Sequence, residues 1–585
     1  MAKKSSKNNN KNYKNDDSYR GRESNSQRRD RDGKARDYDK TAMKKDSSKY
    51  GNGYCGKEND PSWYNKLRTL IQDVTKIPFG YQVGRDLDFS TTTAVSWEED
   101  LGSESQTIFE TAYDRSTPPG VMALDYMCVP GIAKDANDGV NIAAVGLFQN
   151  IRKNLSTVAS YAPADVMMYI LACDSLLTLY NVILRDFGLI NLYSSLNYNY
   201  NKSLFVAQNW RQKDIVDLIS NYSIYRSRFN NLIYKASTIF IPNSFSILDR
   251  HAWLFSNVFI DSVSPKAQIY VHNMRGFYLL DEQASDQGTA LTWNPIEKFD
   301  YNDEGHMMEA LLNAFAFMIE SIRNSDSMNK IAADMARAFP DVGSWKLAYC
   351  DENYTVLPTY SKEVLSQIEN TTILPYDAMS GLNITQSVDK NIILFDPMFS
   401  TSKTDEIANM SILGWSDNNL INMHWDNPSS DDVAVATRNM VNLYKVVPSG
   451  SAPTQIFHMQ SCGSDICVGA RLIKYNTSEP NSDEFAELQR FMAVTATPSA
   501  AQSGSGAFMS PRTLSDYVSF DWAPIIYVCM ATPDTYDTAN PSLYGAKAMS
   551  DYDNYTLVSP ELLNTIHSNV IASMWNVPQL GDVQI

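Results

Sequence analysis

The chain has 585 residues, of which 43% are hydrophobic and 20% are charged, and its formal net charge is −17. This composition excludes a chain that is disordered throughout, and the length predicts two to four domains. The seven cysteines are dispersed, which favours free thiols in a reducing compartment over a disulfide framework.

The first 58 residues, which we call the N-terminal arm, differ in charge from the rest of the chain. Residues 1–49 contain sixteen Lys or Arg against eight Asp or Glu, so residues 50–585 carry a net charge of −25. The arm has almost no aliphatic residues, so we expect it to be disordered on its own and to contain no secretory signal. Basic side chains neutralise phosphates without needing a fold, which makes the arm a candidate RNA-binding segment. The candidate RNA-binding residues are Lys3, Lys4, Lys7, Lys11, Lys14, Arg20, Arg22, Arg28, Arg29, Arg31, Lys34, Arg36, Lys40, Lys44, Lys45 and Lys49.

Helical periodicity dominates the next part of the chain. Asp60 and Pro61 suit an N-cap and a first helical position, and Pro78 ends this first helix. Its predicted apolar face consists of Trp63, Leu67, Leu70, Ile71 and Val74. Further helices are predicted over 141–158, 165–187 with Gly188 as its end, 211–240, 303–324 and 327–339.

One of these helices is long and apolar enough to suggest a membrane span. Residues 166–184 read VMMYILACDSLLTLYNVIL, but Asp174 lies in the middle of the run. A charged side chain is costly at the centre of a bilayer. We therefore expect a long helix that is buried inside the protein.

Strand-like runs replace the helical periodicity after about residue 345. The clearest runs are KNIILFDPMF, TQIFHMQ and ICVGARLIKY, separated by Asn, Asp, Ser, Thr and Pro. Two more helices are expected, over 484–496 and from Ser559 and Pro560 onward, with a flexible loop over 499–507.

No motif in the sequence predicts a catalytic or cofactor site. GNGYCG at 51–56 matches G-x-G-x-x-G, but it follows no strand, so we interpret it as a joint behind the arm. His458, Cys462 and Cys467 lack the paired spacing of a zinc site and are expected to be structural. We therefore expect no catalytic residue, no cofactor, no metal and no small-molecule substrate. An enzyme whose site is assembled from distant residues remains an alternative.

Two segments resemble the capsid proteins of picobirnaviruses. They are YAPADVMMYILACDSLLTLYNVILRDFG (161–188) and FNNLIYKASTIFIPNSFSILDRHAWLFSNVFID (229–261), and PPGVMALDYMCVPG (118–131) precedes them. The resemblance covers roughly residues 115–265. It rests on Pro163, Ala164, Asp165, Met168, Tyr169, Ile170, Leu171, Pro242, Asn243, Arg250, His251, Trp253 and Asn257.

The resemblance implies a viral structural protein and not an enzyme. Capsid proteins of that family form homodimers that build an icosahedral shell around segmented double-stranded RNA, with the basic arm facing the RNA. The implied fold is mainly α with a smaller α+β, loop-rich part, arranged as a helical shell domain and a protruding domain. The implied parts are a disordered basic arm (1–58), the shell domain (59–300), the protruding domain (301–500) and a C-terminal segment that returns to the shell (501–585).

The resemblance also implies where the protein acts. It is expected in the virion, after synthesis in the host cytoplasm, and in contact with a host membrane during infection. Two alternative functions would also explain the basic arm: an RNA-coating protein that forms no shell, and the capsid protein of a related partitivirus-like virus. The arm also contains Asp30, Asp32, Asp37 and Asp39, so neutralising RNA would require many arms together.

Overall fold

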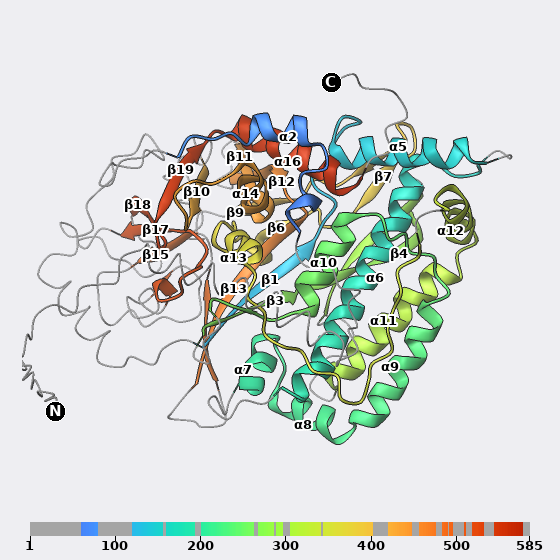
Figure 1. The fold of residues 1–585 in the computed structure, drawn as a ribbon, viewed down its shortest axis with the longest axis horizontal. Helices are drawn as coiled ribbons and strands as arrows, with labels where there is room; N and C mark the ends of the chain where they lie inside the picture. The colour runs from blue at the N-terminus through green and yellow to red at the C-terminus, as the bar shows by residue number, and fades with distance from the viewer. Residues whose placement is uncertain are drawn as a thin grey trace, which may run out of the picture.

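The computed structural model describes residues 60–79, 120–155, 159–192, 200–262, 267–285, 288–296, 305–340, 343–401, 419–446, 455–475, 483–488, 491–494, 508–509, 517–531 and 543–576. Within these ranges most of the long helices lie on one side of the molecule and most of the strands on the other (Figure 1). The N-terminal arm, the GNGYCG segment and the predicted loop at 499–507 lie outside the described residues.

The first described segment is a broken helix. A 3₁₀ turn, η1 (Pro61–Trp63), begins at Asp60, whose carboxylate accepts a hydrogen bond from a backbone N–H of the turn, as the sequence predicts. The helix α2 (Arg68–Val74) follows after an interruption. Ile71 is buried, but Leu70 is 57% exposed, which corrects the predicted apolar face. Because the interruption changes the helical register, the apolar residues of η1 and α2 do not form one continuous face.

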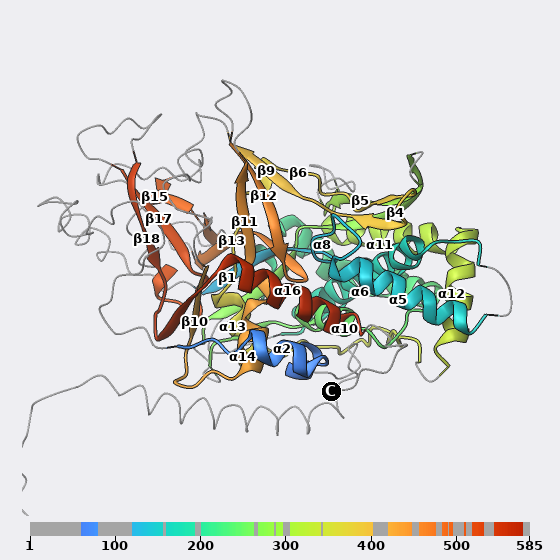
Figure 2. The ribbon, with the colours of Figure 1, turned by 90° about the horizontal axis from the view of Figure 1, so that it is seen from above.

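The helix α6 (Pro163–Ile190) runs through the helical side of the molecule, next to α5 (Gly139–Lys153) (Figures 1 and 2). Among the described residues it is the one helix with the length and hydropathy of a membrane span, and its apolar stretch is wholly buried in the protein. The predicted helix end at Gly188 is wrong, because the helix continues beyond it. A Cβ at Gly188 would lie 2.6 Å from the side chain of Val356, so this glycine allows a neighbouring segment to pack closely.

The predicted helix over 211–240 is two helices, α8 (Gln212–Ser220) and α9 (Tyr222–Ala236). Asn221 separates them, and its side chain donates a hydrogen bond to Asp217 Oδ1 at 2.7 Å. Such local hydrogen bonds of Asn compete with helix continuation. The helix α7 (Tyr200–Ala207) precedes this pair, and α10 (Ser246–Ser256) follows it and packs on α6.

The other predicted helices of this region are confirmed as α11 (Met307–Arg323) and α12 (Asp326–Ala338). α11 packs against both α6 and α9. Shorter elements follow: α13 (Lys362–Glu369), η3 (Tyr376–Ala378), α14 (Ser430–Ala436) and η5 (Thr437–Asn439). The last helix, α16 (Pro560–Met574), begins at Ser559 as predicted and packs against α5, α2 and a strand.

The largest described sheet joins segments that are distant in the sequence. Its order is β14 (Asp483–Leu488), β13 (Asp465–Tyr475), β1 (Val121–Cys128), β3 (Ile269–Met274) and β2 (Phe259–Ile260). β1 pairs antiparallel with β13 and parallel with β3, and its residues are almost all buried. The predicted shell and protruding segments therefore contribute strands to one sheet, and their boundaries stay predictions.

The remaining described strands form smaller sheets. One has the order β11 (Val441–Val446), β12 (Gln455–Cys462), β9 (Met398–Thr401) and β6 (Met379–Ser380). Another has the order β16 (Phe508–Met509), β15 (Phe491–Val494), β17 (Ile526–Ala531) and β18 (Leu543–Met549). The pairs are β10 (Asn419–Met423) with β19 (Asn554–Val558), β4 (Gly276–Ser285) with β5 (Gly288–Pro295), and β7 (Thr385–Ser387) with β8 (Ile392–Leu394).

One predicted helix is wrong. The segment 484–496 contains β14 and β15 instead, in two different sheets. β14 pairs antiparallel with β13, from Tyr475 opposite Asp483 to Ala470 opposite Leu488. Strand pairing with a neighbour overrides the helical propensity of Glu, Ala, Leu and Gln in this segment.

Candidate functional site

A network of buried polar side chains lies where α10 meets the largest sheet. Arg250, on α10, is fully buried and forms a salt bridge with Asp465 at the start of β13. Its guanidinium also donates to Ser464 Oγ at 3.0 Å, to Gln367 Oε1 at 3.0 Å and to Asn439 Oδ1 at 2.9 Å. One arginine therefore joins α10 to β13, α13 and η5.

His251, the next residue on α10, connects this network to α6. Its Nδ1 lies 2.8 Å from Asp174 Oδ2, and its Nε2 lies 3.1 Å from Asp465 Oδ1. Asp174 is the charged residue within the long apolar helix. Because a buried carboxylate needs a charged or hydrogen-bonding partner, the His251 contact explains how α6 can carry an aspartate in the core.

Buried tyrosines extend the network to the first described segment. Gln367 donates a hydrogen bond to the Tyr64 hydroxyl at 3.1 Å, and Asn439 donates to the Tyr126 hydroxyl at 2.9 Å. Burial raises the pKa of Tyr126 well above its usual value, so this hydroxyl stays neutral. The network thus contacts elements from residue 64 to residue 465, and its role is to fix their relative positions.

Buried polar groups also contact the C-terminal helix near a second buried arginine, Arg438. Burial, reinforced by the charge of Arg250, lowers the pKa of Arg438 to about 9. Burial, with Arg438 nearby, lowers the pKa of His567 on α16 to about 3, so its imidazole is neutral. Its Nε2 lies 3.0 Å from the Thr437 carbonyl and therefore donates, while its Nδ1 accepts from Ser461 Oγ at 2.8 Å.

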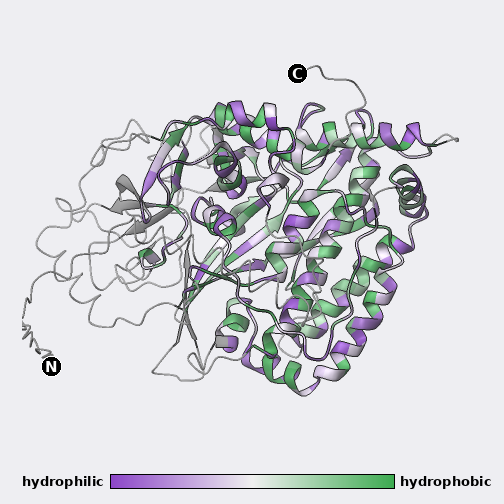
Figure 3. Cartoon of the chain, in the orientation of Figure 1, coloured by the Kyte–Doolittle hydropathy of each residue, from purple (hydrophilic) through white to green (hydrophobic). Residues whose placement is uncertain are grey.

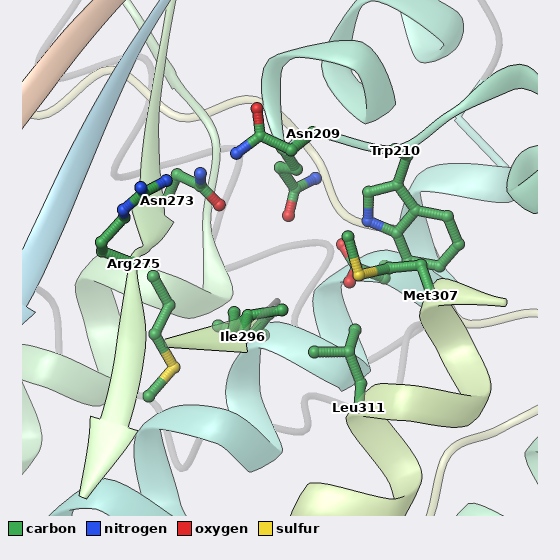
Figure 4. A pocket seen from close by; sticks show the side chains of 11 residues that line it. Asn209, Trp210, Asn273, Arg275, Ile296, Met307 and Leu311 are labelled. Carbon is green, nitrogen blue, oxygen red and sulfur yellow. The ribbon is translucent and has the colours of Figure 1, made fainter. Parts of the chain in front are cut away.

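A small cavity near α6 is too small for an organic ligand. It measures about 30 Å³, and Asn209, Trp210, Arg275 and Met307 are among the residues that line it (Figure 4). Ligand pockets usually enclose about 300–1,000 Å³, so this space suits water. Asp186 also lines it, and burial raises the pKa of this carboxyl to about 7 despite the neighbouring Arg185.

Exposed apolar side chains are concentrated in the helical part of the molecule. Of the twelve large hydrophobic residues that are exposed among the described ones, seven lie on α8, α9, α11 or the segment 345–357. We call these seven the apolar flank: Val216, Ile219, Ile224, Tyr234, Phe317, Tyr349 and Leu357. Their exposed fractions run from 49% for Leu357 to 68% for Ile224.

Hydrogen bonds place α9 beside the segment 345–357 and beside α11, and α8 packs against both helices. Arg226 and Asn230 of α9 donate to the carbonyl of Cys350 at 3.3 and 3.2 Å, which places the segment 345–357 against that helix. On another side, Arg228 of α9 donates to Asn313 of α11 at 2.5 Å. Hydrophobic and hydrophilic residues alternate along α9 and α11 (Figure 3), so apolar side chains are interspersed with polar ones there.

The comparisons with known proteins agree with one another. The model of the family described as picobirnavirus capsid protein matches residues 63–479. The chain belongs to this family. A capsid protein precursor of a human picobirnavirus (strain Human/Thailand/Hy005102/-) is 25% identical over 540 residues, covering 89% of this chain and 92% of the relative. A crystal structure of the picobirnavirus capsid has the same fold, with a TM-score of 0.66 and 22% identity over 90% of this chain and 100% of that one.

The resemblance to picobirnavirus capsid proteins is therefore confirmed, and the chain is a component of a double-stranded RNA virus particle. A capsid is a shell of many copies of its subunit, so surfaces that contact further copies are required. The network described above is internal, and it cannot provide such a surface. The apolar flank, in contrast, is open to solvent in the single chain.

Most of the residues that carry the resemblance are buried in this capsid protein. Asp165 caps the start of α6 by accepting from the Ala162 N–H at 2.9 Å, and the Tyr169 hydroxyl donates to the Phe240 carbonyl at 2.6 Å. Arg250 and His251 form the centre of the buried network. The segment around Pro242 bridges to Ser344. Most of these positions are buried and preserve the fold, whereas Asn243 is exposed.

Other predicted residues fall in two groups. All sixteen candidate RNA-binding residues belong to the N-terminal arm, which lies outside the described residues, so their role stays a prediction. Cys462 and Cys467 are buried in β12 and β13, and His458 stacks on Tyr444.

The sequence analysis missed the partners of Asp174 and Arg250. A lone charge within an apolar helix is the one signal that could have predicted such a partner.

Proposed function

We propose that this chain is the capsid subunit that assembles as dimers into an icosahedral shell around segmented double-stranded RNA. The N-terminal arm would face inward and neutralise RNA phosphates, and the chain would have no catalytic activity. The observation that carries assembly is the apolar flank. Seven of the twelve large hydrophobic residues that are exposed among the described ones lie on these neighbouring elements, which supports a contact with a partner, and the capsid family supplies that partner as a second copy of the chain.

The acidic body and the basic arm support the proposed division of roles. Residues 50–585 carry a net charge of −25, so the body repels nucleic acid, and attraction is confined to the arm with its net charge of +8. The proposed shell domain (59–300) and protruding domain (301–500) follow the family resemblance, with the C-terminal segment (501–585) returning to the shell. Packing of α16 against α5 and α2 supports that return.

A substitution in the apolar flank tests assembly. Ile224→Asp places a charge at the most exposed apolar position, and it should shift the purified protein from large uniform particles to small oligomers in sedimentation and negative-stain images. Val388→Asp is the matched control, because Val388 is 50% exposed but lies outside the flank. Particles of normal size from Ile224→Asp would show that the flank is not an assembly contact.

Deletion of residues 2–49 tests the arm separately. Assembly should persist, while the RNA that copurifies with the particles falls severalfold and loses its salt sensitivity. Unchanged RNA content would overturn the role of the arm. A soluble monomer at every concentration and salt tested would overturn the shell, and complexes whose length follows that of the RNA would favour an RNA-coating protein without a shell.

A further inference from the structure

Three side chains of different elements bring metal-binding atoms together in the core. Cys128 ends β1, His251 lies on α10 and Asp465 begins β13. The thiol sulfur, an imidazole nitrogen and a carboxylate oxygen all lie within 4.8 Å of one another. His251 and Asp465 are buried, and Cys128 is partly buried. The three residues are distant in the sequence, so no motif spacing could have predicted the cluster.

His251 Nε2 and Asp465 Oδ1 lie close together without a hydrogen bond between them. His251 Nδ1 faces both oxygens of Asp174, at 2.8 and 2.9 Å, and therefore carries a proton. Nε2 of His251 lies 3.1 Å from Asp465 Oδ1, and neither atom has a hydrogen-bond partner among the described residues. A cation held between these two buried polar atoms would give both of them a partner.

The surroundings of the cluster are those of a metal site. A histidine that binds a metal usually donates its other N–H to a carboxylate, which orients the ring, and Asp174 does this for His251. Arg250 similarly holds the second oxygen of Asp465. A cavity of about 10 Å³ adjoins Cys128, Asp174 and Thr178 and has room for about one water.

We propose that Cys128, His251 and Asp465 bind a zinc ion. Zinc favours thiolate, imidazole and carboxylate ligands in tetrahedral geometry, in which the ligand atoms are roughly 3.3–3.6 Å apart. These atoms lie within 4.8 Å of one another, so binding would bring any pair closer by at most about 1.5 Å. The charges also balance: Zn²⁺ and Arg250 offset the Cys128 thiolate and the carboxylates of Asp174 and Asp465. The thiol proton leaves to solvent when the zinc–sulfur bond forms.

Metal analysis of the full chain tests this site. Protein purified without chelators from zinc-supplemented cells should contain close to one zinc per chain. The Cys128→Ser variant should lose most of it, and Cys467→Ser should keep it, because Cys467 lies on the same strand as Asp465 but outside the cluster. Refolding with cobalt(II) should give a thiolate-to-metal charge-transfer band that Cys128→Ser lacks.

Stability supplies a second measurement. Zinc that binds only the folded state raises the unfolding midpoint, so refolding with zinc should raise it by several degrees in the parent chain and not in Cys128→Ser. Absence of zinc in the parent chain, with no change of midpoint on zinc addition, would overturn the proposal and leave a proton between His251 and Asp465. An equal zinc content and an equal cobalt charge-transfer band in Cys128→Ser would also overturn it, because the metal would then bind elsewhere on the chain.

Discussion

His424 Nε2 lies 3.0 Å from Glu369 Oε1, at a point where α13 meets the segment that follows β10. Burial opposes the charge on the imidazole, but the neighbouring carboxylate outweighs this effect and raises the pKa of His424 to about 9. Burial raises the pKa of Glu369 as well. The folded state therefore binds protons that the unfolded state releases at the same pH.

This pair predicts a loss of stability at alkaline pH. A histidine whose folded pKa is raised stabilises the protein fully below pH 6.5, and this contribution disappears as the pH rises through 9. The parent chain should lose roughly 2–3 kcal/mol relative to Glu369→Gln between pH 6 and pH 9.5. Urea unfolding of unassembled subunits at the two pH values measures this difference. Parallel pH profiles would contradict the prediction.

His567 predicts the opposite trend in acid. Its folded pKa of about 3 lies below the usual value, so its contribution is complete above pH 6.5 and declines as the pH falls toward 3. His567→Gln should therefore lose less stability than the parent chain between pH 7 and pH 4, by roughly 2–4 kcal/mol. The same unfolding measurements at acidic pH test this. An equal acid sensitivity in both proteins would show that His567 does not report on the contact between α16 and η5.

The close packing around Gly463 predicts that any larger residue at this position will destabilise the fold. A Cβ at this position would lie 1.8 Å from the carbonyl oxygen of Arg438, so Gly463→Ala must displace backbone and should lower the free energy of unfolding by about 3 kcal/mol or more. Gly343→Ala is the control, because a Cβ at Gly343 would meet nothing within 4 Å, and this variant should change stability by less than about 1 kcal/mol. Similar values for both variants would contradict the close approach.

The buried ion pair of Arg250 predicts a large loss of stability when the arginine is replaced. Arg250→Met removes the guanidinium that pairs with the buried Asp465 and should lower the free energy of unfolding by about 3–5 kcal/mol. Lys76→Met removes a cation that contacts Asp73 at 3.4 Å on the surface, and its cost should stay below about 1 kcal/mol. Thermal or chemical unfolding compares the two. If Arg250→Met unfolds like the parent chain, the network does not stabilise the contact between α10 and the sheet.

The helices were largely predictable from the sequence, whereas the sheets and the network were not. Periodic apolar residues located α5, α6, α11, α12 and α16, because burying one helical face is a local requirement. The pairing of β1 with β13 depends on contacts between distant segments, and so does the position of Asp465 beside His251. The segment 484–496 shows the limit most directly, since its composition favours a helix and its neighbour β13 imposes a strand.

The pairing of β1 with β13 also determines when a nascent subunit can finish folding. β1 starts at Val121 and its antiparallel partner ends at Tyr475, so the ribosome must make most of the chain before the two can meet. At about 5–20 residues per second, the apolar strand β1 remains without this partner for roughly 20–70 s. The basic arm has long since left the ribosome by then. The subunit core can therefore be completed only when translation is nearly finished.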